Sequence, residues 1–247
     1  MPIEWRFDVY QKVLSTQNYV HDAVALGEEE GLVVQALQQQ GGRGRHGNKW
    51  EAPIGNLYMS ILLRPNCDLA QAGQLAFVTA VALSEGLGDY IDPEKHSKTL
   101  KWPNDIFIDK TKISGILLES DIRENKLNAI VLGIGVNIFK APEFAVALND
   151  VAKEPVYVNK VRDTILEKLS YYYDLWQEKG FAPIREAWLK QAHGLGEPIT
   201  ARLPEESFKG VFKGLTEDGS LILDMDGTDK IIHAAEVHFG LENEGAA

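Results

Sequence analysis

The 247-residue chain contains a single cysteine, Cys67, so it cannot form an internal disulfide. Proteins without disulfides are typical of reducing compartments, and we therefore expect a cytoplasmic location. Cys67 stands in a polar Arg-Pro-Asn-Cys-Asp run that lacks the signature of a catalytic thiol. The six histidines show no spacing typical of metal ligands, so we expect no metal held by protein side chains.

Long apolar runs are also missing. The first residues, Met-Pro-Ile-Glu-Trp-Arg-Phe-Asp, contain no apolar core of the length found in signal peptides. The longest uncharged run, 69–84, is interrupted by Gln71, Gln74 and Thr79 and is too short to span a membrane. We therefore expect a soluble protein with no membrane partner.

Positive charge is scarce, because 25 lysines and arginines face 36 aspartates and glutamates and leave a formal net charge of −11. A general nucleic-acid-binding protein needs a basic surface, so this balance argues against one. A few focused cations can still hold an anionic ligand. The remaining composition is ordinary for a globular protein, and the length fits one large domain with a small one.

Residues 41–50 concentrate glycines and cations against this acidic background. They hold four glycines together with Arg43, Arg45, Lys49 and Trp50. Backbone N–H groups, guanidinium groups and an aromatic face suit a phosphate that carries a base. A flexible surface loop with solvated charges is the alternative interpretation. The stretch also matches G-x-G-x-x-G, but polar glutamines precede it and no helical pattern follows, which excludes a Rossmann dinucleotide site.

Periodicity and turn residues predict an α+β fold. We expect strands over 7–14, 31–37, 56–63, 99–102, 106–108, 113–118 and 127–138, and helices over 15–26, 74–87 and 159–180, with a shorter helix between Pro183 and Gly194. The meander of strands between residues 99 and 138 implies a mixed or antiparallel sheet rather than a doubly wound one. After residue 196, short strands over 199–203, 208–215, 221–225 and 230–233 alternate with Asp-Gly turns and predict a compact β-barrel.

Two further polar patches interrupt strands that otherwise read as buried. One is Lys101-Trp-Pro-Asn-Asp105 with Lys112 nearby, and the other ends at Asn137. A buried amide must find partners, since leaving it unpaired costs about 1–3 kcal/mol. The edge of adenine offers a donor and an acceptor that match an asparagine amide. The structural alternatives are a strand cap at Asn137 and an Asx-turn at Asn104.

The order and spacing of these motifs resemble those of biotin–protein ligases. The motifs are Gly-Arg-Gly-Arg-x-Gly-x-x-Trp at 42–50, Asn-Leu-Tyr-x-Ser at 56–60, Lys-Trp-Pro-Asn-Asp at 101–105, Lys-x-x-Gly-Ile-Leu-x-Glu at 112–119 and Gly-x-Gly-x-Asn at 133–137. The resemblance implies a class II aminoacyl-tRNA synthetase-like catalytic core over residues 1–195 and a small SH3-like β-barrel over 196–247. Family members that double as repressors carry a winged helix-turn-helix ahead of the core. Only about a dozen residues precede Ser15, so we expect a ligase without a DNA-binding domain and without a DNA partner.

The resemblance also implies the roles of individual residues. It assigns biotin to Ser15, Thr16, Gln17, Gln39, Gly42, Arg43, Gly44, Arg45, Lys112 and Gly115, and ATP to Arg45, Trp50, Asn104, Lys112 and Asn137. It makes Lys112, Arg45 and Arg43 the catalytic cations. The family often shows Ser-Thr-Asn where this chain has Ser15-Thr16-Gln17-Asn18, which leaves open whether Gln17 or Asn18 faces biotin. Ser114 and Ala235 also stand where the family commonly has smaller residues.

The implied reaction is the ATP- and Mg²⁺-dependent activation of biotin as biotinyl-5′-AMP, followed by transfer to a lysine of a biotin carboxyl carrier protein. The identity of the carboxylase stays open, as does the choice between a monomer and a homodimer. Three alternatives are a lipoate- or octanoate-handling transferase of the same fold, a non-catalytic biotin- or nucleotide-binding regulator, and a DNA-binding repressor. The net charge opposes the last of these.

Overall fold

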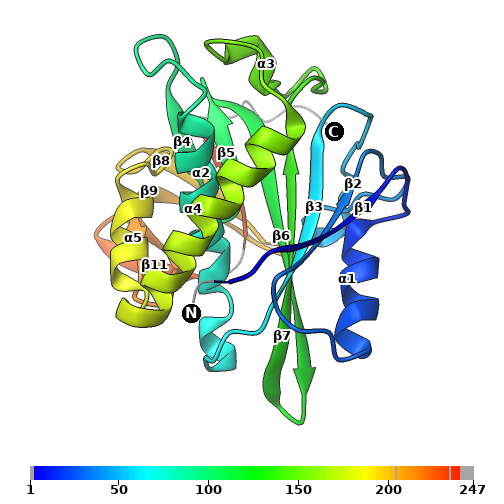
Figure 1. Ribbon diagram of the computed structural model, residues 1–247. Coiled ribbons are helices and arrows are strands. Elements are labelled where there is room, and N and C mark those ends of the chain that lie inside the picture. The colour runs from blue at the N-terminus through cyan, green and yellow to red at the C-terminus, as the bar shows by residue number, and fades with distance from the viewer. Residues whose placement is uncertain (1–2, 204, 234, 240–247) are drawn as a thin grey trace.

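The structure is a computed structural model that describes residues 3–203, 205–233 and 235–239, so residues 240–247 of the predicted second domain lie outside the described part. Its larger sheet has seven strands in the order β1-β2-β3-β7-β6-β5-β4 (Figure 1). Their bounds are β1 Arg6–Tyr10, β2 Leu32–Ala36, β3 Leu57–Leu63, β4 Lys98–Lys101, β5 Asp105–Ile108, β6 Thr111–Arg123 and β7 Lys126–Val136. β1 and β2 are parallel and every other pair is antiparallel, which confirms the predicted mixed sheet.

Helices cover both faces of this sheet. They are α1 Thr16–Ala25, α2 Gln74–Gly88, α3 Leu148–Val151, α4 Val158–Lys179 and α5 Ala182–Leu189. Successive side chains of a strand point to opposite faces, so Val33 and Val34 serve different layers. Val34 packs in a cluster with α1 residues, whereas Val33 belongs to the larger core that includes α2 and α4. Trp176 of α4 is part of that larger core.

The α1 face of β7 changes character along the strand. Ala129 and Val131 pack under α1, but the next residues at the same two-residue spacing are Gly133, Gly135 and Asn137. The apolar layer under α1 therefore ends at Gly133 and Gly135, which have no side chains, and the amide of Asn137 follows them. This part of the sheet is open to a ligand on the α1 side.

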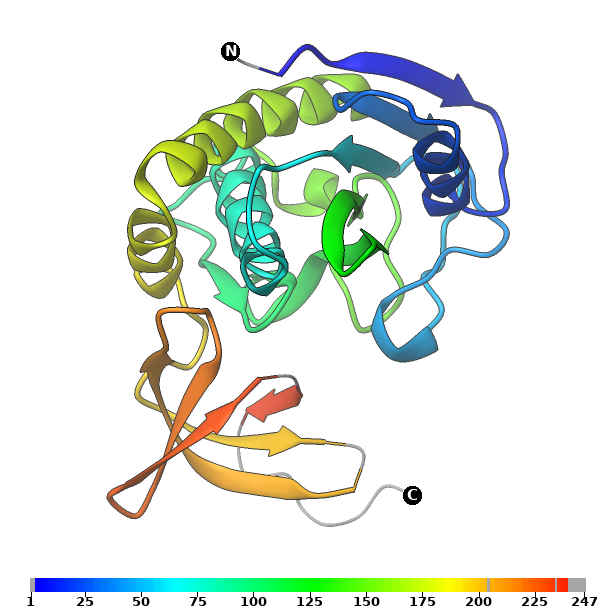
Figure 2. The ribbon, with the colours of Figure 1, turned by 90° about the horizontal axis from the view of Figure 1, so that it is seen from below.

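The smaller sheet follows α5 in the chain and forms a separate layer (Figure 2). It holds β8 Pro198–Arg202, β9 Ser207–Leu215, β10 Leu221–Met225, β11 Thr228–Ile232 and β12 Glu236–Phe239, in the antiparallel order β11-β10-β9-β8-β12. Asp226 and Gly227 form the predicted tight turn, and both have positive φ as a two-residue hairpin requires. The indole N–H of Trp102 donates to the carbonyl of Gly219 at 3.1 Å and links the two sheets.

Several elements differ from the sequence prediction, among them β6, which continues to Arg123 instead of ending at residue 118. β1 ends at Tyr10 rather than at residue 14, and beyond it Val13 forms only an isolated bridge with Gln39. α3 and β12 were not predicted, because each is four residues long and neither shows a helical or alternating pattern over several turns. Their formation depends on packing against the rest of the chain, which local sequence does not reveal.

Asn56 precedes β3 and holds the segment after β7. Its Oδ1 accepts the N–H groups of Ile138, Phe139 and Lys140 at 2.9, 3.0 and 3.1 Å, and its Nδ2 donates to the carbonyl of Lys140 at 2.8 Å. The residue is 2% exposed. One amide therefore satisfies four backbone groups close to Asn137, which directly follows β7.

We predict that Asn56→Ala lowers the free energy of unfolding by about 2–4 kcal/mol, because several buried backbone groups lose their partner at once. Urea denaturation followed by circular dichroism measures the change. Asn66→Ala is the control, since Asn66 is exposed. Equal midpoints for the two variants would contradict this role of Asn56.

Candidate functional site

A pocket of about 520 Å³ lies on the α1 side of the larger sheet, over the glycines of β6 and β7. Twelve of the predicted site residues line it: Ser15, Thr16, Gln17, Gln39, Arg43, Gly44, Arg45, Trp50, Asn104, Lys112, Gly115 and Asn137. Gly42 is behind the wall rather than in it. A Cβ on Gly42 would lie 2.6 Å from the carbonyl oxygen of Trp50, so a side chain there would displace the loop.

The middle of the pocket is a flat floor covered by Trp50. Gly115 of β6 is paired with Gly135 of β7, so two neighbouring strand positions lack side chains. A Cβ on Gly135 would lie 2.7 Å from Cε2 of Trp50, and one on Gly115 would lie 3.0 Å from its Cζ3. The indole therefore rests directly on the backbone of both strands. Among the described residues its buried Nε1 has no hydrogen-bond partner.

One end of the pocket is a set of uncharged polar groups at the start of α1. Oε1 of Gln39 accepts the backbone N–H of Thr16 at 2.7 Å and lies 3.1 Å from Thr16 Oγ1. That hydroxyl is also 2.7 Å from Oγ of Ser60, a buried residue of β3. Ser15 occupies the helix N-cap position but makes no capping bond with its side chain. These groups line the pocket with hydroxyls and amides, and Gln39 also satisfies the first N–H group of α1.

Gln17 and Asn18 have different surroundings. Gln17 is 4% exposed and lines the pocket, whereas Asn18 Oδ1 accepts a hydrogen bond from Arg43 at 2.8 Å. Nε2 of Gln17 donates to Glu119 at 2.9 Å, and its buried Oε1 has no partner in the described part of the chain. An unpaired buried acceptor costs about 1–3 kcal/mol, so this oxygen is a candidate to receive a ligand N–H.

The other end of the pocket combines a lysine with two asparagines. Nζ of Lys112 is 2.7 Å from Oδ1 of Asp105 and 5.3 Å from the ring centroid of Trp50. Asn137 is 3% exposed, and in the described ranges no side-chain hydrogen bond of its amide occurs. The Nδ2 of Asn104 donates to the carbonyl of Ile116 at 2.6 Å, which fixes the 101–105 turn against β6. Asn104 therefore has a structural role besides its place in the pocket wall.

Arg43 and Arg45 diverge although they are two residues apart. Arg43 is bound to Asn18 and lies 3.7 Å from Glu119 at the outer edge of the pocket. Arg45 lies deeper, where burial lowers the pKa of its guanidinium and the carboxylates of Asp105 and Glu236 oppose that shift. Arg45 and Lys112 are therefore two cations of the pocket wall near Asp105.

Several residues in the pocket wall or directly behind it were not predicted from the sequence. Asp105 and Glu119 belong to the quoted motifs, but only the structure shows their pairing with Lys112 and with Gln17. Tyr58 lines the pocket from β3, where burial raises its pKa and its hydroxyl donates to the carbonyl of Pro53 at 2.8 Å. Residues 235–238 of the smaller sheet also line the pocket, and no local sequence signal placed them there.

The arrangement suits an elongated ligand with three parts. A neutral hydrogen-bonding group fits beside Thr16 and Gln39, an anionic centre fits beside Lys112, and a planar base fits beside Asn137. Trp50 separates the first part from the last. No group of three or more His, Cys, Asp or Glu side chains able to hold a metal ion occurs among the described residues. In the same ranges, no helix combines the length and apolar character that crossing a membrane demands.

Comparisons with known families and proteins agree with this geometry. Residues 9–137 match the model described as the Biotin/lipoate A/B protein ligase family, and residues 194–240 match the Biotin protein ligase C terminal domain. The chain is similar to a biotin--[acetyl-CoA-carboxylase] ligase of Paracoccus denitrificans, at 40% identity over 84% of this chain and 90% of that protein. It is 32% identical to the bifunctional ligase/repressor BirA of Bacillus subtilis (strain 168), over 94% of this chain and 74% of that protein.

Solved structures show the same likeness. The biotin protein ligase from Aquifex aeolicus in complex with biotin and ATP matches with a TM-score of 0.82 and 26% identity, over 95% of this chain and 99% of that one. The Leishmania major biotin protein ligase in complex with biotinyl-5-AMP has a TM-score of 0.67 at 24% identity, over 93% and 99% of the two chains, and shares the fold.

We predict that Gly135→Ala displaces Trp50 from the sheet, because the added methyl group would lie inside the contact distance of the indole. Acrylamide quenching of tryptophan fluorescence, with Trp50→Phe subtracted to isolate this residue, should show increased access to Trp50. Gly73→Ala is the control, since nothing lies within 4 Å of a Cβ built there. Unchanged quenching in the Gly135 variant would contradict the described contact.

Proposed function

The chain belongs to the biotin/lipoate A/B protein ligase family, and from this premise we propose that its pocket joins biotin to ATP and passes the biotinyl group to a protein lysine. The observation that carries the proposal is the division of one pocket by Trp50 into a neutral polar end and an end with Lys112 and Asn137. An enzyme that makes an acyl-adenylate must bind the acid and the nucleotide next to each other, with a cation near the reacting carboxylate and phosphate. The chain is thus a ligase that forms an amide bond through biotinyl-5′-AMP.

Biotin suits the neutral end. Its ureido ring carries two N–H donors and a carbonyl acceptor, which match the hydroxyls and amides of Thr16, Gln39 and Gln17. The dithiolane ring of lipoate offers no N–H donor, so these polar groups would be left without partners on binding it. This contrast favours biotin over lipoate within a family whose name covers both. Of the two adjacent amides, we assign the ligand contact to Gln17, since Asn18 is engaged by Arg43.

The nucleotide suits the other end, where Asn137 can pair with the edge of adenine and Trp50 offers an aromatic face. ATP enters as its Mg²⁺ complex, with the metal as part of the substrate. The biotin carboxylate reaches past the glycine floor and attacks the α-phosphorus of ATP, and pyrophosphate leaves. Lys112 and Arg45 stabilise the negative charge that develops at the α-phosphate. Arg43 contributes from the edge of the loop.

The adenylate is a mixed anhydride that water would hydrolyse, so the site must exclude solvent until the acceptor arrives. The loop at 41–50 can do this because its glycines let the backbone approach the ligand closely. Gly42 shows such a close approach within the loop, since a Cβ there would lie 2.6 Å from the carbonyl oxygen of Trp50. A neutral lysine of the acceptor then attacks the acyl carbon, AMP leaves and an amide bond forms. No enzyme nucleophile is needed.

The partner that we propose is the biotin carboxyl carrier domain of a carboxylase, which the name of the Paracoccus denitrificans relative supports. We keep the division at residues 195 and 196, supported by the separate match of 194–240 and by the separate sheets. The cytoplasm stays the proposed compartment because the single cysteine is free. A homodimer stays one of two predicted possibilities beside a monomer, and the expected lack of DNA binding stays a prediction.

Pyrophosphate release from ATP without any acceptor protein tests the function. We expect a burst of about one equivalent with biotin, and background rates with lipoate or with neither acid. Release with lipoate alone would keep the reaction class and overturn the substrate. No release with biotin, although biotin binds, would make the protein a sensor rather than a ligase.

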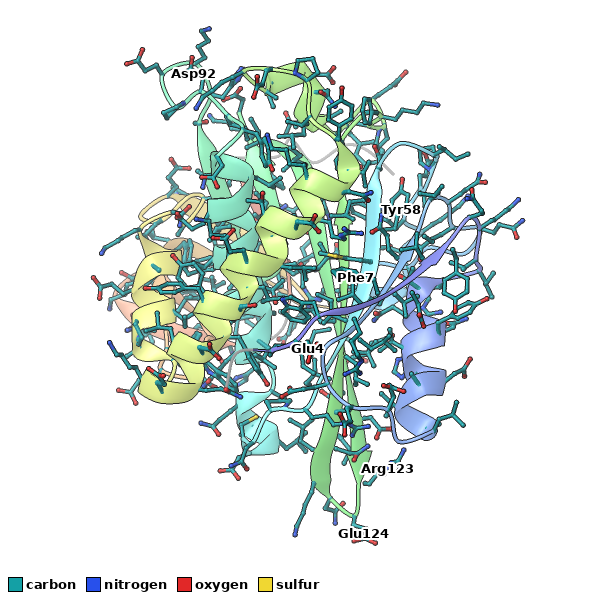
Figure 3. The ribbon with its side chains drawn as sticks, viewed as in Figure 1. Glu4, Phe7, Tyr58, Asp92, Arg123 and Glu124 are labelled. Carbon is teal, nitrogen blue, oxygen red and sulfur yellow. The ribbon has the colours of Figure 1, made fainter. Side chains whose placement is uncertain are left out.

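We predict that Lys112→Ala slows single-turnover adenylation by about 10²–10³-fold, because a cation at the developing charge is removed. Quenched-flow measurement of biotinyl-5′-AMP formation gives the rate, and calorimetry gives biotin affinity, which should change far less. Lys126→Ala is the control, since Lys126 is exposed and begins β7 next to the hairpin tip. Figure 3 shows Arg123 and Glu124 of this tip far from Tyr58, which lines the pocket. An adenylation rate equal to wild type would remove Lys112 from this role.

A further inference from the structure

Glu119 occupies a junction behind the neutral end of the pocket. It lies on β6 opposite Val131 of β7, on the face that carries α1. Its Oε2 is 2.9 Å from Nε2 of Gln17 and 2.8 Å from Nε2 of His21. Glu119 does not itself line the pocket, so any influence on a ligand must pass through a neighbour.

The carboxylate fixes the orientation of the Gln17 amide. An ionised carboxylate only accepts hydrogen bonds, so Gln17 must turn its NH₂ group toward Glu119. The same Nε2 lies 3.5 Å from the carbonyl oxygen of Val131, a second acceptor on that side. The amide oxygen is therefore forced to the opposite side, where it lies 3.1 Å from the place of a Cβ on Gly133. That oxygen is buried and has no partner among the described residues.

We propose that Glu119 is a positioning residue for ligand recognition: it holds the Gln17 amide with the oxygen toward the pocket, so that Gln17 accepts an N–H of the ureido ring. This inference rests on the proposed function and adds to it the source of selectivity for a donating ring. Without the carboxylate the amide can rotate and present NH₂, which repels a ligand N–H. Selection of biotin then depends on a residue that never touches it.

The rival explanation is structural, since Glu119 also contacts His21 and lies 3.7 Å from Arg43, and so ties α1 and the loop to β6. Loss of such a tie would weaken every ligand and lower stability together. Loss of amide orientation would instead weaken ligands according to the N–H that they offer. The two explanations therefore separate on a chemical comparison between ligands.

The experiment uses the whole 247-residue chain and calorimetric titration with biotin and with its two singly N-methylated derivatives, one for each ureido nitrogen. Glu119→Met keeps the length of the side chain but removes the charged acceptor. We expect the Kd of biotin to rise by roughly 10- to 100-fold in this variant. The preference of the wild type for biotin over the derivative methylated at the facing nitrogen should shrink by a similar factor, which closes a thermodynamic cycle.

A charge exchange provides the rescue. In the double variant Gln17→Glu with Glu119→Gln, the new amide at 119 donates to a carboxylate at 17, whose second oxygen accepts a ligand N–H in either orientation. We expect biotin affinity to return to within about fivefold of wild type. Asp121→Asn is the matched control two residues along β6, where the carboxylate contacts Arg123 and Asn128 instead of the pocket. Its affinity for biotin should equal that of wild type.

Three results would overturn the proposal: unchanged biotin affinity in Glu119→Met, an equal loss for biotin and both methylated derivatives, or a double variant no better than Glu119→Met. Thermal melts of each variant identify those that are unfolded, and the double variant keeps the test decisive if Glu119→Met is among them. Failure of the proposed function appears separately, as a wild-type protein that binds no biotin and releases no pyrophosphate with it.

Discussion

The structure depends on the absence of two side chains. Gly115 and Gly135 stand side by side on β6 and β7, and the indole of Trp50 lies where their Cβ atoms would be. A pleated sheet with ordinary residues there would fill the space that the ring now occupies. The loop at 41–50 is thereby attached to the sheet through one aromatic contact. The contact divides the pocket into two compartments and leaves Lys112 at the boundary between them.

The charge of the protein gives this boundary its importance. A chain with a formal net charge of −11 repels anions in general, so an anionic ligand can be held only where cations are concentrated. Lys112 and Arg45 supply that concentration, and Asp105 is paired with Lys112 at 2.7 Å. We propose that the α-phosphate of ATP takes the place of Asp105 as the partner of Lys112.

Local patterns sufficed to predict the strands and long helices, because alternation and helical periodicity are properties of short windows. The sequence also indicated Asn137 as a candidate binding residue, since an amide at the end of a buried strand needs a hydrogen-bond partner. Local patterns did not predict the partner of Gln17, because its hydrogen bond to Glu119 joins residues that are 102 positions apart. Nor could they separate Gln17 from Asn18, which are adjacent in sequence and differ only in what the fold places beside them. α3 and β12 were missed for a related reason, as their stability comes from packing rather than from their own composition.

The most direct test of the account is a crystal structure of the protein with biotinyl-5′-AMP. We expect the ureido ring to lie beside Thr16 and Gln39 on one side of Trp50, the adenine to lie beside Asn137 on the other, and Lys112 to contact the phosphate. Both rings on the same side of Trp50, or a phosphate remote from Lys112, would contradict the division of the pocket on which the account is built.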